Sequence, residues 1–248
     1  MTVNHKFFLH LAFQIAEKNL GKTGLNPSVG SIVVNNDTVI SSGVTSINGR
    51  PHAEFNALNK VKNTAGSTLY TSLEPCVHRG KTPPCIDIII KKKIKNVFFG
   101  LEDPDRRTFK KAKKILNANG IKTKLIRLKK YNNFYRSYII NKKFKIPFIS
   151  AKIAISKDYF TINKNDKWIT NDFSRKITHL IRSQHDGIIS TSKSINYDNA
   201  LLNCRIEGLN EFKPDLFIVD LNLKLKKNLL LNNILKKRKT YLITYKTN

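Results

Sequence analysis

The chain has 248 residues, 40% of them hydrophobic, and its mean hydropathy of −0.34 is typical of a soluble globular protein. This length allows one large domain or two modest ones, and no apolar run approaches the length of a membrane span. The 45 Lys and Arg residues against 17 Asp and Glu residues give a formal charge of +28.

This positive charge has two explanations. Binding to a polyanion or to a phosphorylated substrate would explain it functionally, whereas a general enrichment in Lys, Asn and Ile would explain it as composition alone. The basic residues recur in short separate runs, among them 91–93, 110–111 and 236–239, and do not form one patch. This spread favours solvated faces over a dedicated nucleic-acid surface.

The cysteines and the N-terminal segment bear on the compartment. Three cysteines, an odd number, argue against a disulfide framework and favour thiols or metal ligands in a reducing environment. The segment Phe7 to Leu20 is amphipathic, contains Glu17 and has no small-residue cleavage site. We therefore expect no secretory signal and a cytoplasmic protein.

In chain order, the first half alternates helical and strand patterns. Apolar residues at a helical period begin the series, and a Pro-Pro pair precedes the third helical segment. The expected helices cover 7–19, 52–60, 83–92 and 109–118, and the expected strands cover 30–34, 39–44, 68–72, 96–100 and 123–128. This order predicts a helix–sheet–helix sandwich whose later strands run parallel, with a site at their carboxyl ends.

A Lys-, Tyr- and Asn-rich stretch over 129–145 separates the two halves. We place the domain boundary at its end, which gives domains 1–145 and 146–248. In the second domain Asn171 or Asp172 is expected to cap a helix that runs through Arg182. Strands are expected over 148–155, 187–191, 216–220 and 241–245.

The chemistry is concentrated in three short motifs: His52-Ala53-Glu54, Glu74-Pro75-Cys76 and Pro83-Pro84-Cys85. One imidazole and two thiolates are three zinc ligands, and a catalytic zinc keeps its fourth position for water, whose pKa it lowers. Glu54, two residues after the histidine on the first turn of a helix, can exchange protons with that water without binding the metal. These motifs predict a zinc-dependent hydrolytic deaminase with Glu54 as the catalytic residue and His52, Cys76 and Cys85 as the metal ligands.

A departure in cysteine spacing and one structural alternative accompany this interpretation. Nucleobase deaminases carry His-x-Glu and then Pro-Cys-x-x-Cys, whereas eight residues separate the two cysteines here. A structural zinc knot with His78 as its fourth ligand would use the same residues, but it explains neither Glu54 nor the position of the ligands at helix starts. Cys204 lies far outside the cluster and is expected to be a buried small apolar residue.

At these residues the chain resembles the bifunctional deaminase/reductase family of riboflavin biosynthesis. The resemblance lies in Asn26-Pro27-Ser28-Val29-Gly30, in Pro51-His52-Ala53-Glu54, and in the long segment 73–85 that ends in Thr-Pro-Pro-Cys. It implies a cytidine-deaminase-like α/β/α sandwich followed by a dihydrofolate-reductase-like α/β domain. The implied reaction is hydrolytic deamination of a phosphorylated diamino-ribosylamino-pyrimidinone, with Asn26 as a substrate contact and His78 and Lys81 on the loop over the pocket.

The resemblance continues into the second domain, through Lys152, Ser156 and Asp158 and then through Trp168-Ile169-Thr170. It implies NADPH-dependent reduction of the ribose to a ribityl chain. The implied NADPH contacts are Ala154, Trp168, Ser194 and Asp198. The implied contacts to the phosphorylated sugar are Asp166, Arg182, Leu202 and Arg205, and the two guanidinium groups suit phosphate well.

The chain departs from this family in four places. Val44-Thr45 replaces an aromatic–histidine pair, and the loop 103–107 keeps the Asp-Pro pair but loses later family residues. Tyr159 stands where glycine is expected, and no Gly-rich segment follows Gly208 where the family has a loop that cradles the cofactor phosphates. The sequence therefore predicts a reductase-like domain that is incomplete at its carboxyl end.

Three functions remain open. The first is the riboflavin-pathway deaminase, which needs one zinc ion per chain and acts on a small phosphorylated pyrimidine, with NADPH as a second cofactor only if the reductase-like domain works. The second is a deaminase of nucleic-acid bases of the tRNA type, against which the cysteine spacing and the second domain argue. The third is a non-enzymatic zinc-stabilised binding protein. We expect no membrane partner, and a homo-oligomer is compatible with the sequence.

Overall fold

The computed structural model describes residues 4–161, 168–211 and 214–245. The chain divides into two compact units, residues 1–149 and 150–248. No helix in the described part of the chain is long and apolar enough to cross a membrane.

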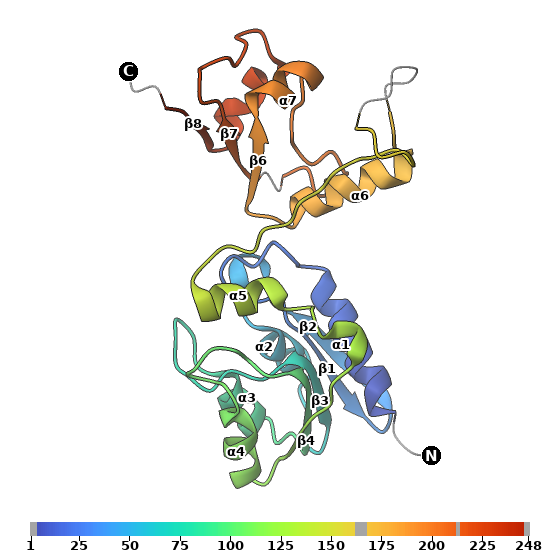
Figure 1. The fold of residues 1–248 in the computed structure, drawn as a ribbon. Coiled ribbons are helices and arrows are strands. Elements are labelled where there is room, and N and C mark those ends of the chain that lie inside the picture. The colour runs from blue at the N-terminus through green and yellow to red at the C-terminus, as the bar shows by residue number, and fades with distance from the viewer. Residues whose placement is uncertain (1–3, 162–167, 212–213, 246–248) are drawn as a thin grey trace. The chain divides into compact units, whose positions relative to one another are not determined.

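The first unit is built on a five-stranded sheet of order β2-β1-β3-β4-β5 (Figure 1). Strand β1 pairs antiparallel with both β2 and β3, whereas β3, β4 and β5 run parallel, as the sequence predicts for strands joined through helices. The strands are β1 (Gly30–Asn35), β2 (Thr38–Val44), β3 (Thr68–Leu73), β4 (Asn96–Leu101) and β5 (Lys122–Leu125).

Helices cover both faces of this sheet, so the predicted helix–sheet–helix sandwich is confirmed. On one face, Phe8 and Phe13 of α1 (His5–Glu17) pack with Tyr131 and Tyr135, which precede α5 (Arg136–Phe144). On the other face, buried side chains of three helices pack on the strands: α2 (Ala53–Asn59), α3 (Cys85–Lys91) and α4 (Lys111–Ala118). Burial of these apolar side chains is the main stabilising term of the unit.

Helix α2 lies unusually close to β2 because Gly43 has no side chain. A β-carbon placed on Gly43 would lie 2.3 Å from the carbonyl oxygen of Ala53 and 2.4 Å from the amide nitrogen of Ala57. These distances are far below van der Waals contact, so only glycine allows the two backbones to approach in this way. The approach fixes the position of the helix that begins directly after His52.

The second unit contains a parallel three-stranded sheet of order β6-β7-β8. Its core is formed by Ile195, Leu216, Ile218, Leu229 and Leu231. Its elements are α6 (Asp172–Ser183), β6 (Gly187–Thr191), α7 (Ser192–Asp198), β7 (Asp215–Val219), the 3-10 helix η3 (Leu230–Lys237) and β8 (Thr240–Ile243).

One expectation for this part of the chain is wrong. The segment 148–155 forms no strand, because its backbone joins no sheet ladder among the described residues. The stretch 129–145, for which the sequence analysis gave no helix, contains helix α5, whose neighbouring residues Tyr131 and Tyr135 belong to the core of the first unit. The predicted helix capped by Asn171 is confirmed, since the Asn171 side chain accepts a hydrogen bond from the Ser174 amide.

Candidate metal centre and active site

Three elements of the first unit bring the predicted metal ligands together. His52 is the residue before α2, Cys76 follows β3 after two further residues, and Cys85 is the first residue of α3. Their ligand atoms all lie within 4.8 Å of one another, and among the described residues they form the only such group of three or more His, Cys, Asp or Glu side chains. The site lies at the carboxyl end of β3, where a parallel sheet is expected to carry its ligands.

The distances within this group fit a tetrahedral zinc ion. The Nδ1 atom of His52 lies 3.6 Å from the Sγ atom of Cys76 and 3.4 Å from that of Cys85. Zinc–sulfur bonds of about 2.3 Å and zinc–nitrogen bonds of about 2.0 Å at a tetrahedral angle require a nitrogen–sulfur distance of about 3.5 Å. The three side chains therefore hold the spacing that the ion requires, with His52 offering Nδ1.

Glu54 lies beside this group and is almost completely buried, with 3% of its surface exposed. Its Oε2 atom accepts a hydrogen bond of 3.4 Å from the Cys85 thiol. Burial raises the pKa of the Glu54 carboxyl, while the nearby His52 imidazole lowers it. A carboxyl group with a raised pKa in a dry site is suited to take up a proton and to release it again.

Contact between the two thiols shifts their pKa values in opposite directions. The Cys85 thiol lowers the pKa of Cys76 to about 4 by hydrogen bonding to it, and the Cys85 amide donates a second bond of 3.2 Å to the same sulfur. The same contact and deep burial raise the pKa of Cys85. A lowered pKa favours the thiolate form of Cys76, which is the form that binds a metal cation.

Polar side chains form a rim around the metal group. The Asn26 amide donates a hydrogen bond of 3.0 Å to the carbonyl of Gly49, next to Arg50. The Arg50 guanidinium donates to the Thr82 hydroxyl and lies 3.4 Å from Nε2 of His52. The His78 ring is hydrogen-bonded to Thr108 at 3.1 Å and is not a member of the metal group.

Glu74 has a structural role that the sequence did not indicate. It is buried, and its carboxylate accepts hydrogen bonds from the backbone amides of Asp103, Lys110 and Ala112. These bonds tie the end of β3 to the loop after β4 and to the start of α4. They hold in place the wall of the site that contains Thr108, the partner of His78.

Thr45 and Lys81 are two further positions of the first unit that the sequence analysis named. Thr45, which stands where the related family has a histidine, is buried and hydrogen-bonded to Val29, so its side chain is not available to a ligand. Lys81 is exposed on the loop between the two cysteines.

In the second unit, the residues implied to contact NADPH do not form one hydrogen-bonded group among the described residues. Ser194 is exposed at the start of α7, where its amide bonds to Thr191, and Asp198 is exposed at the end of the same helix. Trp168 packs against the guanidinium of Arg175, 4.6 Å from the ring centroid, and Ala154 is half-buried in an irregular segment. Asp166 lies outside the described residues.

Of the implied contacts to the phosphorylated sugar, the three described residues Arg182, Leu202 and Arg205 lie together. Arg182 and Arg205 both bond to Asn203, at 3.1 Å to its backbone oxygen and 3.1 Å to its side-chain oxygen respectively. Leu202 immediately precedes that residue, and its carbonyl accepts a bond of 2.8 Å from the buried Arg238. Burial, and then the charge of Arg205, lower the pKa of Arg182, so the structure places several cations around one loop. Such a group is suited to an anion. In this loop Cys204 is buried, as expected.

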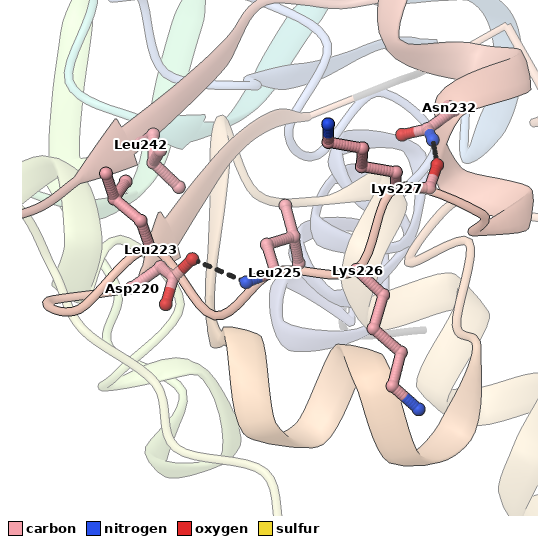
Figure 2. Close-up of a pocket in the computed structure, with 7 residues that line it drawn as sticks. All are labelled: Asp220, Leu223, Leu225, Lys226, Lys227, Asn232 and Leu242. Carbon is pink, nitrogen blue, oxygen red and sulfur yellow. Dashed lines mark hydrogen bonds between the residues drawn. The ribbon is translucent and has the colours of Figure 1, made fainter.

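A pocket of about 360 Å³ lies beside the carboxyl end of β7 (Figure 2). Asp220, the residue after β7, accepts bonds from the amides of Lys224 and Leu225 and from the Ser192 hydroxyl. None of the implied NADPH or sugar contacts lines this pocket, whose lining residues are Asp220, Leu223, Leu225, Lys226, Lys227, Asn232 and Leu242.

The layered sheet and the His–Cys–Cys group beside a buried glutamate define the class of zinc-dependent cytidine-type deaminases. Residues 2–101 match the family model of the cytidine and deoxycytidylate deaminase zinc-binding region, and residues 147–248 match that of the RibD C-terminal domain. The chain belongs to the RibD family of riboflavin biosynthesis proteins.

Relatives and solved structures agree with this assignment. The chain is 37% identical over 214 residues to riboflavin biosynthesis protein RibD of Buchnera aphidicola, covering 83% of the chain and 56% of the relative. It is 33% identical over 206 residues to RibD of Bacillus amyloliquefaciens, covering 81% of the chain and 55% of the relative. The chain thus spans about half the length of the curated relatives it matches.

Among solved structures, the chain is similar to a diaminohydroxyphosphoribosylaminopyrimidine deaminase/5-amino-6-(5-phosphoribosylamino)uracil reductase from Thermotoga maritima. The TM-score is 0.87 at 28% identity, covering 98% of this chain and 70% of that one. RibD of Acinetobacter baumannii gives a TM-score of 0.84 at 25% identity, with the same coverage.

Proposed function

We propose that this protein is a zinc-dependent deaminase of riboflavin biosynthesis that acts on a small phosphorylated aminopyrimidine. The observation that carries the proposal is the group of His52, Cys76 and Cys85 with Glu54 buried beside it. We assign this activity to residues 1–145. A bound zinc ion would supply a water of lowered pKa that can attack the ring carbon bearing the amine.

Glu54 performs the proton transfers in this proposal. Its carboxylate accepts a proton from the attacking water and delivers it to the adjacent ring nitrogen; a further proton then passes to the departing amine, which leaves as ammonia. The balance is one water consumed and one ammonia released as the C–NH2 group becomes a carbonyl. Burial of Glu54 supports the role because a carboxyl in a dry site is protonated more readily.

We further propose that residues 146–248 contribute to NADPH-dependent reduction of the ribose of the deaminated product. The family match and the cations around Asn203 support the proposal, with Arg182, Leu202 and Arg205 contacting the phosphorylated sugar. Asp166 is the remaining proposed sugar contact, and Ala154, Trp168, Ser194 and Asp198 are the proposed NADPH contacts. Asn26 is proposed to contact the pyrimidine substrate.

A coupled assay tests both activities. Zinc-analysed protein receives the phosphorylated diaminopyrimidine with and without NADPH, and ammonia release and NADPH oxidation are followed separately. Ammonia release is the expected result for the first unit, and NADPH oxidation that depends on prior deamination is expected if the second unit acts as proposed. Stoichiometric zinc without ammonia release would contradict the deaminase.

A nucleic-acid substrate is the second candidate, and only the formal charge of +28 favours it. The match of the second half to the RibD C-terminal domain supports the small-molecule substrate instead. Base conversion in RNA by the purified protein would revive this candidate. We propose the cytoplasm as the location because thiol ligands remain reduced there.

A further inference from the structure

The Arg50 side chain lies at the rim of the metal group and is held there from two sides. The Asn26 side chain fixes the preceding residue through its bond of 3.0 Å to the Gly49 carbonyl. Arg50 itself has an extended backbone, and its Nη1 atom lies 3.4 Å from Nε2 of His52, two residues later. Its guanidinium crosses to the loop between the two cysteines and donates to the Thr82 hydroxyl.

The guanidinium lies close to the backbone of this loop at Gly80. A β-carbon at Gly80 would lie 3.4 Å from Nη2 of Arg50, which is ordinary van der Waals contact, and this is the only neighbour it would meet within 4 Å. Arg50 is half-buried, with its charged end between the His52 ring and the backbone of this loop. The position of the guanidinium is therefore determined by packing as well as by one hydrogen bond.

Most donors of this guanidinium have no protein partner. Both described contacts, to Thr82 and to His52, involve Nη1, and neither Nε nor Nη2 is a buried unpaired atom. Among the described residues no carboxylate forms an ion pair with Arg50. Nε and Nη2 lie in one plane and are open to solvent, and together they can bind one oxyanion in a bidentate manner.

Two acids that follow β4 are paired with other arginines. Asp105 pairs with Arg107 at 2.6 Å, and Glu102 pairs with Arg127 at 2.7 Å. Moreover, a histidine that holds a metal through Nδ1 carries its proton on Nε2, so the face of His52 toward Arg50 also presents a donor. With the metal bound in this way, the side of the site between His52 and Arg50 presents donors and no acceptor, which suits an anion.

We propose that Arg50 binds the phosphate group of the pyrimidine substrate and thereby makes the deaminase site select phosphorylated over unphosphorylated substrate. The inference rests on the proposed deaminase function and deepens it. Arg50 meets the phosphate through Nε and Nη2, while Nη1 remains bonded to Thr82. The Asn26 side chain is joined to the same segment through its amide bond to Gly49, and its amide oxygen has no described hydrogen-bond partner.

The test compares two substrates in three variants of the full-length, zinc-loaded chain. The substrates are the phosphorylated diaminopyrimidine and the same compound after removal of the phosphate. The variants are Arg50→Gln, Arg50→Lys and the control Arg106→Gln, which removes an exposed arginine of the loop after β4. Zinc content and thermal unfolding of each variant are measured first, so that loss of fold is recognised.

For Arg50→Gln we expect KM for the phosphorylated substrate to rise 10- to 100-fold, while kcat for that substrate changes less than threefold. The kcat/KM for the unphosphorylated substrate should be unchanged. Arg50→Lys should recover part of the loss, because a point charge replaces a bidentate fork. Arg106→Gln should behave as the wild type. Equal losses of kcat/KM on both substrates, or loss of zinc in Arg50→Gln, would overturn the proposal. Arg50 would then only hold two loops together.

A second measurement separates this proposal from the deaminase itself. Inorganic phosphate should raise the unfolding temperature of the zinc-loaded wild type and protect it less in Arg50→Gln. If the wild type deaminates neither substrate, the proposed function fails, while a phosphate effect that depends on Arg50 would still support the anion site. Identical phosphate effects in both proteins would contradict the anion site even where deamination is observed.

Discussion

Glu54 contacts one of the metal ligands, but its role is proton transfer and not metal binding. It lies beside Cys85, yet its carboxylate is protonated more readily than an exposed one because it is buried. Replacement by glutamine keeps the shape and removes the exchangeable proton. We expect Glu54→Gln to bind zinc as the wild type does and to lose turnover by roughly 100-fold or more.

Metal analysis and ammonia release measured on the same preparation check this prediction. The matched control is Glu102→Gln, which changes the acid directly after β4 that pairs with Arg127. Near-normal turnover in Glu54→Gln would exclude it from proton transfer.

The thiols supply a second prediction at this scale. Cys85 is buried at the start of α3, and its serine variant removes one of the three ligands while keeping nearly the same volume. We expect Cys85→Ser to lose zinc and to unfold at a lower temperature, because binding of a structural or catalytic metal stabilises the folded state. Cys204→Ser, in the other unit, should retain zinc. One zinc ion per chain in Cys85→Ser would refute the ligand assignment.

The sequence predicted the members of the metal group but not the residues that surround it. His52 and Glu54 are recognisable because zinc chemistry demands particular residue types at a particular spacing. Glu74 and Arg50 act through contacts with segments up to 38 positions away in the chain, such as the amide of Ala112. No local pattern encodes such a contact. The nearest signal for Arg50 is its spacing of two residues from His52 in an extended segment.

At the scale of elements, the site depends on how closely α2 approaches β2. The Gly43→Ala substitution would place a methyl group 2.3 Å from the Ala53 carbonyl oxygen, and backbone atoms cannot yield as a flexible side chain can. We expect α2 to be displaced with His52 and Glu54. The substitution should destabilise the first unit by about 1–3 kcal/mol and weaken zinc binding.

Chemical denaturation and zinc titration check the effect of Gly43→Ala. Gly80→Ala is the control for stability, since its new methyl group meets only the flexible end of Arg50 at 3.4 Å. Equal stability of Gly43→Ala and the wild type would mean that α2 does not depend on this contact.

Element prediction succeeded where the pattern and the tertiary contacts agree. The alternating and helical patterns of the first unit identified β1 to β5 and α1 to α4, because each buries one regular apolar face. The segment 148–155 reads as a strand from its β-branched residues, but its backbone pairs with no other strand. Helix α5 was missed because its polar composition hides the apolar contacts of Tyr138 and Ile139 with the core.

At the scale of the whole molecule, the 45 basic side chains far outnumber the acidic ones. The acids in the loop after β4 form specific bonds. Asp105 binds Arg107 and Lys142, while Asp103 is buried and accepts bonds from the Asp105 amide and the Tyr138 hydroxyl. The stability of the first unit should therefore respond to pH through its buried acids and not through its surface.

Asp103 offers the clearest case. Burial raises the pKa of its carboxyl from 3.8 to about 6 in the folded protein. A carboxyl whose pKa is raised on folding favours the folded state when protonated, so its contribution is complete below pH 4 and is lost as the pH rises through about 6. The shift of about two pKa units corresponds to about 3 kcal/mol, because each unit represents about 1.4 kcal/mol.

Asparagine at this position keeps an oxygen for both hydrogen bonds and carries no charge. We therefore expect Asp103→Asn and the wild type to be equally stable at pH 4, and the variant to be more stable by up to about 3 kcal/mol at pH 8. Urea denaturation across this range measures the difference, in which the titration of all other groups cancels. Asp37→Asn, which changes an exposed aspartate between β1 and β2, is the control. A stability difference for Asp103→Asn that does not change with pH would show that the Asp103 carboxyl ionises as easily in the folded protein as in the unfolded chain.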